Sequence, residues 1–321
     1  MRSGARLDRW GLRSVPSLRY LGGRPQFSRH AYLDFGSERE DVGPAGGFML
    51  DGRVDQLAQQ ALAPLVDPAE MANGSLEGLS ARLRQLPYAA EFPRIFGPTD
   101  DARGLGAQAA AALAAFELED PSFHPYSSRF DRYLEGQAVL SSQELAGLRL
   151  FNDPAKGNCA ACHTLATGPG AQPPQFTDYS YHALGVPRNP AVPANRDSHF
   201  FDLGLCGPLR KDLQRENAYC GYFKTPTLRN VARRHFFFHN GRFTSLQQVL
   251  LFYVQRDLAP ARWYPRTGVG VRKFDDLPRR YRANVDTSDA PFNRAVGLPP
   301  ALDGDEISEV VAFLRTLNDA N

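Results

Sequence analysis

The sequence predicts an all-α protein with two similar helical modules and long loops. Six stretches have the apolar spacing or composition that favours a helix, whereas the loop-rich stretch 166–225 shows no convincing strand pattern. A short motif, Asp/Asn-Gly-Arg followed four residues later by Leu, occurs at 51–57 and again at 240–246, each time before a helix. We therefore expect one module in residues 1–125, incomplete at its amino end, and a second in residues 126–321.

The first module is expected to contain three helices. Residues 1–50 are irregular because Gly and Pro interrupt every periodic pattern. Residues 54–65 place apolar side chains along one helical face, and Asp67-Pro68 ends that element. Residues 76–86 repeat leucine at helical spacing, and the Ala-rich residues 106–119 favour a helix by composition. We interpret their apolar faces as core.

The second module is also expected to contain three helices. The helix over 141–152 opens with a capping box of Ser141 and Glu144 and leads directly into a cysteine cluster. Residues 244–256 form a capped, mostly apolar helix. Residues 303–319 carry acidic side chains in the first turn, as the helix dipole favours.

Composition excludes two classes of partner. The 321 residues include 37 Lys and Arg against 35 Asp and Glu, a net charge of +2. This balance predicts neither a nucleic-acid partner nor an anionic membrane surface. No run of about 18 apolar residues occurs, so we expect no membrane span.

The strongest motif is Cys159-Ala160-Ala161-Cys162-His163. In C-x-x-C-H, two thiols add to the vinyl groups of a haem and the next imidazole binds the iron. A redox dithiol would require a βαβ context, which is absent, and a zinc site would require two more ligands at short spacing. The motif therefore predicts covalent haem c and makes the modules cytochrome c-like.

The same motif predicts the compartment. Covalent haem attachment takes place outside the cytoplasm in bacteria, so we expect a periplasmic protein. An oxidising compartment also favours a disulfide between Cys206 and Cys220, which would contribute about 3 kcal/mol, although two free buried thiols are the alternative. The first twenty residues contain no secretory signal. We therefore expect the natural amino terminus to lie upstream of Met1.

The second axial ligand of the iron is not methionine from this module, because no methionine follows Cys162. The alternatives are an open site or one of the following side chains: His182, His199, His235, His239 and Tyr253. A tyrosinate or imidazole ligand would lower the reduction potential and favour peroxide chemistry over simple electron transfer.

Several ordered motifs then resemble one family. The segments 223–231 and 239–241 resemble the haem-binding carboxyl-terminal domain of bacterial di-haem cytochrome c peroxidases and the related MauG-type enzymes. The segments 16–19, 47–53 and 60–71 resemble the amino-terminal domain of the same family. The likeness covers nearly the whole chain.

The resemblance implies roles for individual residues. His163 would be the proximal ligand of the second haem, and Tyr253 falls at its distal position, where the MauG type also has Tyr. Gln60 and Glu70 match the polar pair on the peroxide side of the first haem, with Glu70 as acid and base. His239 matches the histidine near the pocket between the haems. Each role has a structural alternative. Tyr253 would be a buried aromatic, Gln60 and Glu70 a solvated helix face and a turn acid, and His239 a satisfied turn histidine.

The chain departs from the family pattern at several points. The first C-x-x-C-H, expected before Pro16, is not in this sequence, although we expect a second haem in a full-length form. The tryptophan between the haems falls at Leu50. An asparagine that helps hold calcium falls at Tyr20, which makes calcium doubtful. No His lies beside Pro16, as in the open MauG-like arrangement.

The resemblance implies a periplasmic oxidoreductase that reduces hydrogen peroxide with electrons passed through haem. A small redox protein or a protein substrate would be the partner. The alternatives are a single-haem electron-transfer cytochrome without peroxidase activity and a haem-bearing binding protein without turnover. The oligomeric state, electron donor and substrate stay open.

Overall fold

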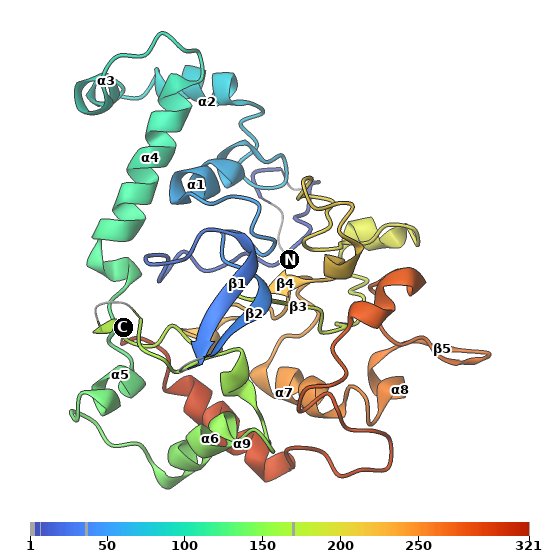
Figure 1. Ribbon diagram of the computed structural model, residues 1–321. Helices are drawn as coiled ribbons and strands as arrows, with labels where there is room; N and C mark the ends of the chain where they lie inside the picture. The colour runs from blue at the N-terminus through green and yellow to red at the C-terminus, as the bar shows by residue number, and fades with distance from the viewer. Residues whose placement is uncertain (1–3, 7, 36–37, 169–170, 321) are drawn as a thin grey trace.

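The computed structural model describes residues 4–6, 8–35, 38–168 and 171–320. The chain is mostly helical, and the longest helix, α4, stands along one side with α1 beside it (Figure 1). The helices of the amino-terminal half are α1 (Leu57–Val66), α2 (Leu76–Leu83), α3 (Glu91–Phe96) and α4 (Gly104–Glu119). Those of the carboxyl-terminal half are α5 (Arg129–Leu134), α6 (Ser142–Asn152), α7 (Leu246–Gln255), α8 (Pro260–Trp263) and α9 (Gly304–Arg315).

All six expected helices are present within a few residues of their predicted bounds. Helix α6 begins with the predicted capping box, in which the Ser141 hydroxyl accepts from Glu144 N and the Glu144 carboxylate accepts from Ser141 N. Asp303 caps α9 in the same way with Glu306. These caps satisfy backbone N–H groups that the first helical turn leaves free.

The prediction of an all-α protein was wrong in one respect. The described residues contain three two-stranded antiparallel sheets. The largest sheet, β1–β2, occupies part of the amino-terminal stretch that the sequence predicts to be irregular. The pairing of the two strands shifts register between Ser28 and Ala31 and again before Tyr32. These shifts interrupt the two-residue alternation of side chains by which a strand is predicted. The strands are β1 (Ser28–Phe35), β2 (Glu38–Ala45), β3 (Tyr181–His182), β4 (Phe223–Lys224), β5 (Arg266–Thr267) and β6 (Gly270–Val271).

The main core lies in the carboxyl-terminal half, where α6 crosses α9 (Figure 1). The crossing is close at Gly147, because a Cβ atom there would lie 2.0 Å from the carbonyl oxygen of Glu309. Next to this contact, Phe151 and Phe313 pack edge to face with ring centroids 5.2 Å apart. This packing fixes the end of α6, from which the chain enters the cysteine motif.

The amino-terminal segment lies against the carboxyl-terminal half. Arg13 forms an ion pair with Asp202 at 2.7 Å, and Ser14 N donates to the carbonyl oxygen of His239 at 2.7 Å. Such contacts place this segment beside the loops between the cysteine motif and α7. No helix among the described residues is long and apolar enough to cross a membrane.

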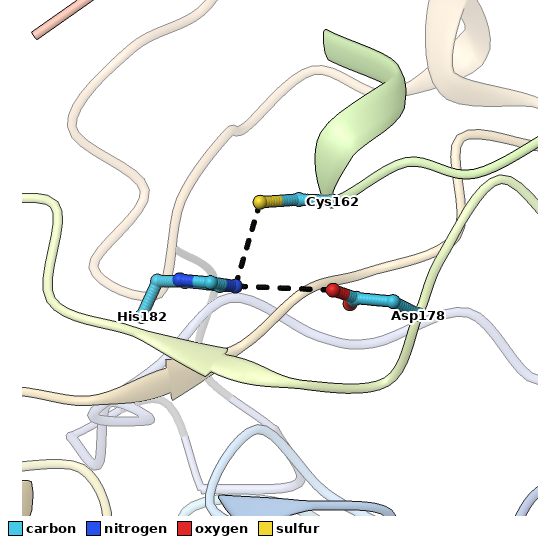
Figure 2. Close-up of side chains that lie close together, drawn as sticks. All are labelled: Cys162, Asp178 and His182. Atoms are coloured by element: carbon cyan, nitrogen blue, oxygen red, sulfur yellow. Dashed lines mark hydrogen bonds and ion pairs between the residues drawn. The ribbon is translucent and has the colours of Figure 1, made fainter. Parts of the chain in front are cut away.

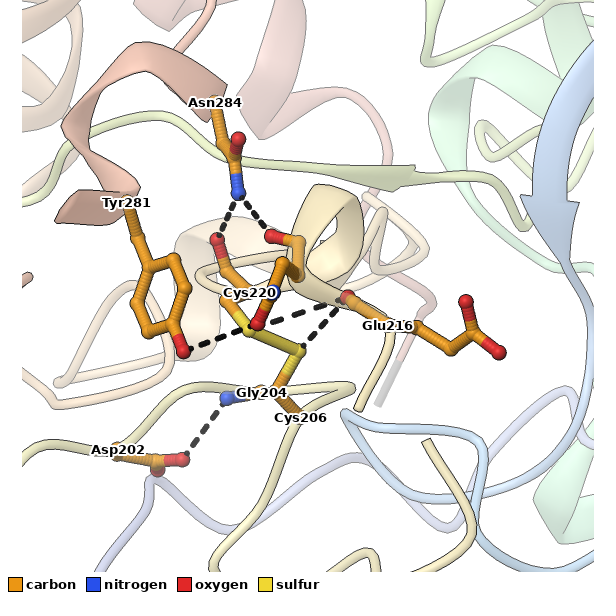
Figure 3. Close-up of a disulfide and its surroundings, with 8 residues drawn as sticks. Asp202, Gly204, Cys206, Glu216, Cys220, Tyr281 and Asn284 are labelled. Carbon is orange, nitrogen blue, oxygen red and sulfur yellow. Dashed lines mark hydrogen bonds between the residues drawn. A yellow bond between two sulfur atoms is a disulfide. The ribbon is translucent and has the colours of Figure 1, made fainter. Parts of the chain in front are cut away.

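The predicted disulfide between Cys206 and Cys220 is confirmed, with Cα atoms 5.0 Å apart. Figure 3 shows its surroundings: the carbonyl oxygen of Glu216 lies beside both sulfurs, and Asn284 donates to the carbonyl oxygen of Cys220 at 3.0 Å. Tyr281 packs with the two cysteines in a small buried cluster. The disulfide therefore closes a loop within 206–220, and Tyr281 and Asn284 hold that loop against the segment 279–284.

Candidate functional site

The cysteine motif forms one tight turn directly after α6. Asn158 adopts a left-handed conformation with φ 48°, and a single 3-10 turn follows over Cys159–Ala161. His163 N donates to the carbonyl oxygen of Cys159 at 2.8 Å. Cys159 and Cys162 are both free thiols. One turn therefore presents two thiols and an imidazole together, as covalent haem attachment requires.

These three side chains line a cavity of about 290 Å³. Its walls are largely apolar and come from α6, α7, α9 and the loops between them. Tyr253, from α7, lines the same cavity. Among the apolar lining residues are Phe151, Val186, Leu228, Leu250, Val254 and Leu302. An apolar cavity with a few convergent polar groups is the usual form of a cofactor site.

The orientation of His163 is fixed by a backbone hydrogen bond. Its Nδ1 atom lies 2.9 Å from the carbonyl oxygen of Phe176. A carbonyl only accepts, so Nδ1 carries the hydrogen and Nε2 is the free, unprotonated nitrogen. Burial lowers the pKa of His163, which keeps the imidazole neutral. A neutral imidazole with an oriented free nitrogen is a suitable iron ligand.

Tyr253 offers an unpartnered hydroxyl in this cavity. Its ring packs against Phe238 and Phe292, with centroids 5.8 Å and 5.3 Å away. Among the described residues, no hydrogen bond reaches its hydroxyl group. Burial, followed by the nearby thiols of Cys159 and Cys162, raises the pKa of Tyr253 above its ordinary value. The residue is half-buried and lines the cavity, so its hydroxyl group is available to a ligand bound there.

The structure narrows the alternatives for the second axial ligand. His199 is exposed at the surface, and His235 is exposed outside the cavity lining. His182 and His239 do line the cavity, but the Nε2 atom of each already has a polar partner. Tyr253 lines the cavity with no hydrogen bond to its hydroxyl group among the described residues.

His182 belongs to a polar cluster that the sequence does not reveal. Figure 2 shows its Nε2 atom between the Cys162 sulfur, at 3.4 Å, and the Asp178 carboxylate, at 3.9 Å. The Ser180 hydroxyl lies 2.7 Å from the same nitrogen and donates to Asp178 at 2.5 Å. Burial opposes protonation, but the hydrogen bonds to Asp178 and Cys162 outweigh it and raise the pKa of His182 to about 10. Cys162, Asp178 and His182 could also hold a metal ion in haem-free protein.

His239 lies at the end of the cavity near the amino-terminal segment. Its ring stacks on Phe223 with centroids 3.7 Å apart, and its Nε2 atom is 3.4 Å from the Asp276 carboxylate. Asn240 donates to the same carboxylate at 2.9 Å. The side chain is buried with a defined partner, and its role near the pocket between the haems stays a prediction.

Gln60 and Glu70 do not meet in this cavity. Gln60 is buried on α1, and its Oε1 atom has no hydrogen-bond partner among the described residues. Glu70 is exposed, although partial burial and the neighbouring Asp67 raise its pKa. Neither residue lines the cavity that contains His163. Their proposed role in peroxide chemistry stays a prediction.

Two positions where the chain departs from the family pattern have defined surroundings. Leu50 lines the cavity, and its carbonyl oxygen accepts from Lys224 N at 3.0 Å. Tyr20 is buried, and its hydroxyl donates to Asp319 at 2.5 Å. The Arg229 guanidinium lies 4.8 Å from the centroid of the Tyr20 ring. An aromatic ring thus packs at the position where the resemblance predicts a calcium-binding amide.

The residues present fit a covalently attached haem. The fit rests on two unpaired thiols, an imidazole with a free Nε2, a tyrosine hydroxyl without a partner, and an apolar cavity that joins them. A C-x-x-C-H turn with this surrounding fits a haem c site better than a dithiol or zinc site.

The comparisons with known proteins agree with this geometry. The family model for di-haem cytochrome c peroxidase matches residues 6–139. The methylamine utilization protein MauG of Paracoccus denitrificans is 32% identical over 316 residues, covering 96% of this chain and 75% of that protein. The cytochrome c551 peroxidase of Nitrosomonas europaea is 30% identical over 278 residues, covering 83% of this chain and 60% of that protein.

A solved structure is also similar over nearly the whole chain. The crystal structure of the diheme peroxidase BthA from Burkholderia thailandensis superposes with a TM-score of 0.87 and 39% sequence identity, covering 99% of this chain and 75% of that one. Sequence and structure thus agree over almost every residue described above. The chain belongs to the di-haem cytochrome c peroxidase and MauG family.

Proposed function

We propose that this protein is a periplasmic haem c oxidoreductase that reduces hydrogen peroxide, with a small redox protein or a protein substrate as its partner. One observation carries the proposal: the free Nε2 of His163 and the unpartnered hydroxyl of Tyr253 face one cavity beside two free thiols. Bound there, a haem would supply one-electron chemistry at a low reduction potential, because oxygen and nitrogen donors favour ferric iron.

Four residues of the cavity and His239 would each have a defined role toward the haem. Cys159 and Cys162 would tether the haem, and His163 would hold its iron in an orientation set by Phe176. Tyr253 would supply a phenolate oxygen. His239 would position polar groups at the near end of the cavity, through its contact with Asp276.

On the peroxide side, we propose that Glu70 moves a proton between the peroxide oxygens and that Gln60 orients the substrate. The raised pKa of Glu70 supports this role, because a general acid and base works best with a pKa closer to the operating pH. The unpartnered Oε1 of buried Gln60 supports the role of a hydrogen-bond acceptor.

A second candidate function is electron transfer by a single-haem cytochrome c without peroxidase activity. It is favoured by the separation of Gln60 and Glu70 from the cavity that contains His163. The division into modules 1–125 and 126–321 and the doubt about calcium also stay predictions.

Two measurements on protein matured in the periplasm test the proposal. A pyridine haemochrome assay counts covalent haems per chain, and peroxide consumption is followed with a reduced cytochrome c as donor. We expect peroxide turnover that falls at least tenfold in Glu70→Gln and is unchanged in Glu77→Gln, an exposed acid on α2. Haem without peroxide turnover would support the electron carrier, and haem-free protein would exclude both.

A further inference from the structure

Two basic side chains, one half-buried and one buried, line the haem cavity without a carboxylate partner. Arg24, which precedes β1, and Lys224, on β4, both line the cavity. The Arg24 Nε atom is buried and has no hydrogen-bond partner among the described residues. Lys224 is 6% exposed, and its ammonium group donates to the carbonyl oxygen of Gly47, which carries no net charge.

Neither cation finds its counter-charge in the surrounding protein. The Arg24 guanidinium lies over the rings of Phe48 and Tyr179, 5.0 Å and 5.5 Å from their centroids. No ion pair to Arg24 or Lys224 occurs among the described residues. Burial and the nearby charge of Arg24 both lower the pKa of Lys224.

The buried carboxylate of Asp51, whose charge acts on Lys224, already pairs with other cations. Asp51 contacts Arg13 at 2.8 Å through one oxygen and Arg53 at 2.8 Å through the other. Two basic side chains therefore lie close together at the cavity, where the charged form of either one needs a compensating anion. The side from which compensation can come is the cavity itself.

We infer that Arg24 and Lys224 form the carboxylate-binding end of this cavity and hold the propionate groups of the covalently attached haem. A haem c is tethered through its vinyl groups, so its two propionates lie at the other edge of the ring. A guanidinium and an ammonium are the groups that proteins use for carboxylates in dry sites. The backbone bond from Lys224 N to Leu50 O places this end of the cavity beside Leu50.

The inference rests on the haem of the proposed function but not on peroxide turnover. Its readout is therefore the reduction potential of the haem. Removing a cation from beside the propionates favours ferric over ferrous haem, because the ferric form carries one more positive charge.

The experiment compares Arg24→Gln and Lys224→Gln with the wild type by spectroelectrochemical titration of haem-replete protein. We expect the ferrous-to-ferric ratio at a fixed potential to fall about tenfold, equal to about 59 mV for a one-electron couple. Arg24→Lys keeps the charge and should restore most of the ratio. Arg29→Gln, an exposed arginine paired with Glu216, is the matched control and should leave it unchanged.

A sulfate titration of the wild type at constant ionic strength separates propionate from a free anion. Propionates tethered in place leave no room for sulfate, so the potential should stay constant. A saturable shift in the wild type that disappears in Arg24→Gln would overturn the inference in favour of a free-anion site. Unchanged potentials in both Gln variants of haem-replete protein would overturn it while leaving the proposed function intact, and haem-free protein would overturn both.

Discussion

The Nδ1 atom of His163 lies 2.9 Å from the carbonyl oxygen of Phe176. Phe176 is fully buried and has a left-handed backbone with φ 53°, which a bulky residue adopts only when its surroundings hold it there. Phe130 and Phe313 pack against its ring edge to face. The aromatic core therefore fixes the carbonyl group, and the carbonyl group fixes the imidazole.

The first prediction concerns Tyr253. Replacing Tyr253 by Phe removes the free hydroxyl from the cavity and should change the ferric haem spectrum from low spin toward high spin. Tyr219→Phe, a half-buried tyrosine beside the disulfide, is the control and should leave the spectrum as it is. An unaltered ferric spectrum in Tyr253→Phe would exclude this residue as the iron ligand.

A second prediction concerns the crossing of α6 and α9. Gly147→Ala places a methyl group 2.0 Å from the Glu309 carbonyl oxygen, so the helices must separate. We expect the free energy of unfolding to fall by about 3 kcal/mol, the upper end of the usual overpacking cost. Denaturant unfolding measures it. Gly304→Ala is the control, because a Cβ atom there meets nothing within 4 Å, and it should leave the free energy of unfolding unchanged or slightly higher. An equal change in the free energy of unfolding for both variants would contradict the close crossing.

The third prediction concerns the buried ion pair of Asp131 and Arg229. Two hydrogen bonds of 3.0 Å and 2.9 Å join the side chains, and both are 1% exposed. Asp131→Asn leaves the guanidinium uncompensated and should lower the free energy of unfolding by about 3–5 kcal/mol. Glu91→Gln, in an exposed pair with Arg94, should cost less than about 1 kcal/mol.

The same pair predicts a pH dependence. Burial by itself raises the pKa of Asp131, but the hydrogen bonds and charge of Arg229, with those of Ser128, outweigh it and hold the pKa below its ordinary value. The unfolded chain therefore binds this proton first, so the stabilisation is complete above about pH 4 and is lost as pH falls through the folded-state pKa. Asp131→Asn should show a shallower loss of stability in that range, and an identical acid profile would refute this account.

The fourth prediction concerns the disulfide. Replacing Cys206 and Cys220 together by Ala should lower the free energy of unfolding by about 3 kcal/mol, because a short closed loop gains freedom in the unfolded chain. Haem content should be retained, since the attachment thiols are Cys159 and Cys162. Loss of haem from the folded double variant would show that the disulfide also shapes the cavity.

Local sequence rules predicted the long helices well because their signals are local. The capping boxes at Ser141 and Asp303 and the Ala-rich α4 are set by neighbours within four residues. The shorter α3, α5 and α8 span six, six and four residues, too few for a periodic pattern. The strands β3 and β4 have two residues each and pair with one another although about forty residues separate them in the sequence. Only tertiary contacts define this pair.

The sequence by itself determined the chemistry of the cysteine motif, because Cys159, Cys162 and His163 lie within one turn of backbone. It also identified the family through motifs spread along the chain. Tertiary structure alone decided which further polar groups surround that turn: the His182 cluster and the basic side chains of Arg24 and Lys224 meet at the same cavity, whereas Tyr253 was already expected there from the resemblance. Such convergence follows from how the core packs, and no spacing rule along the chain encodes it.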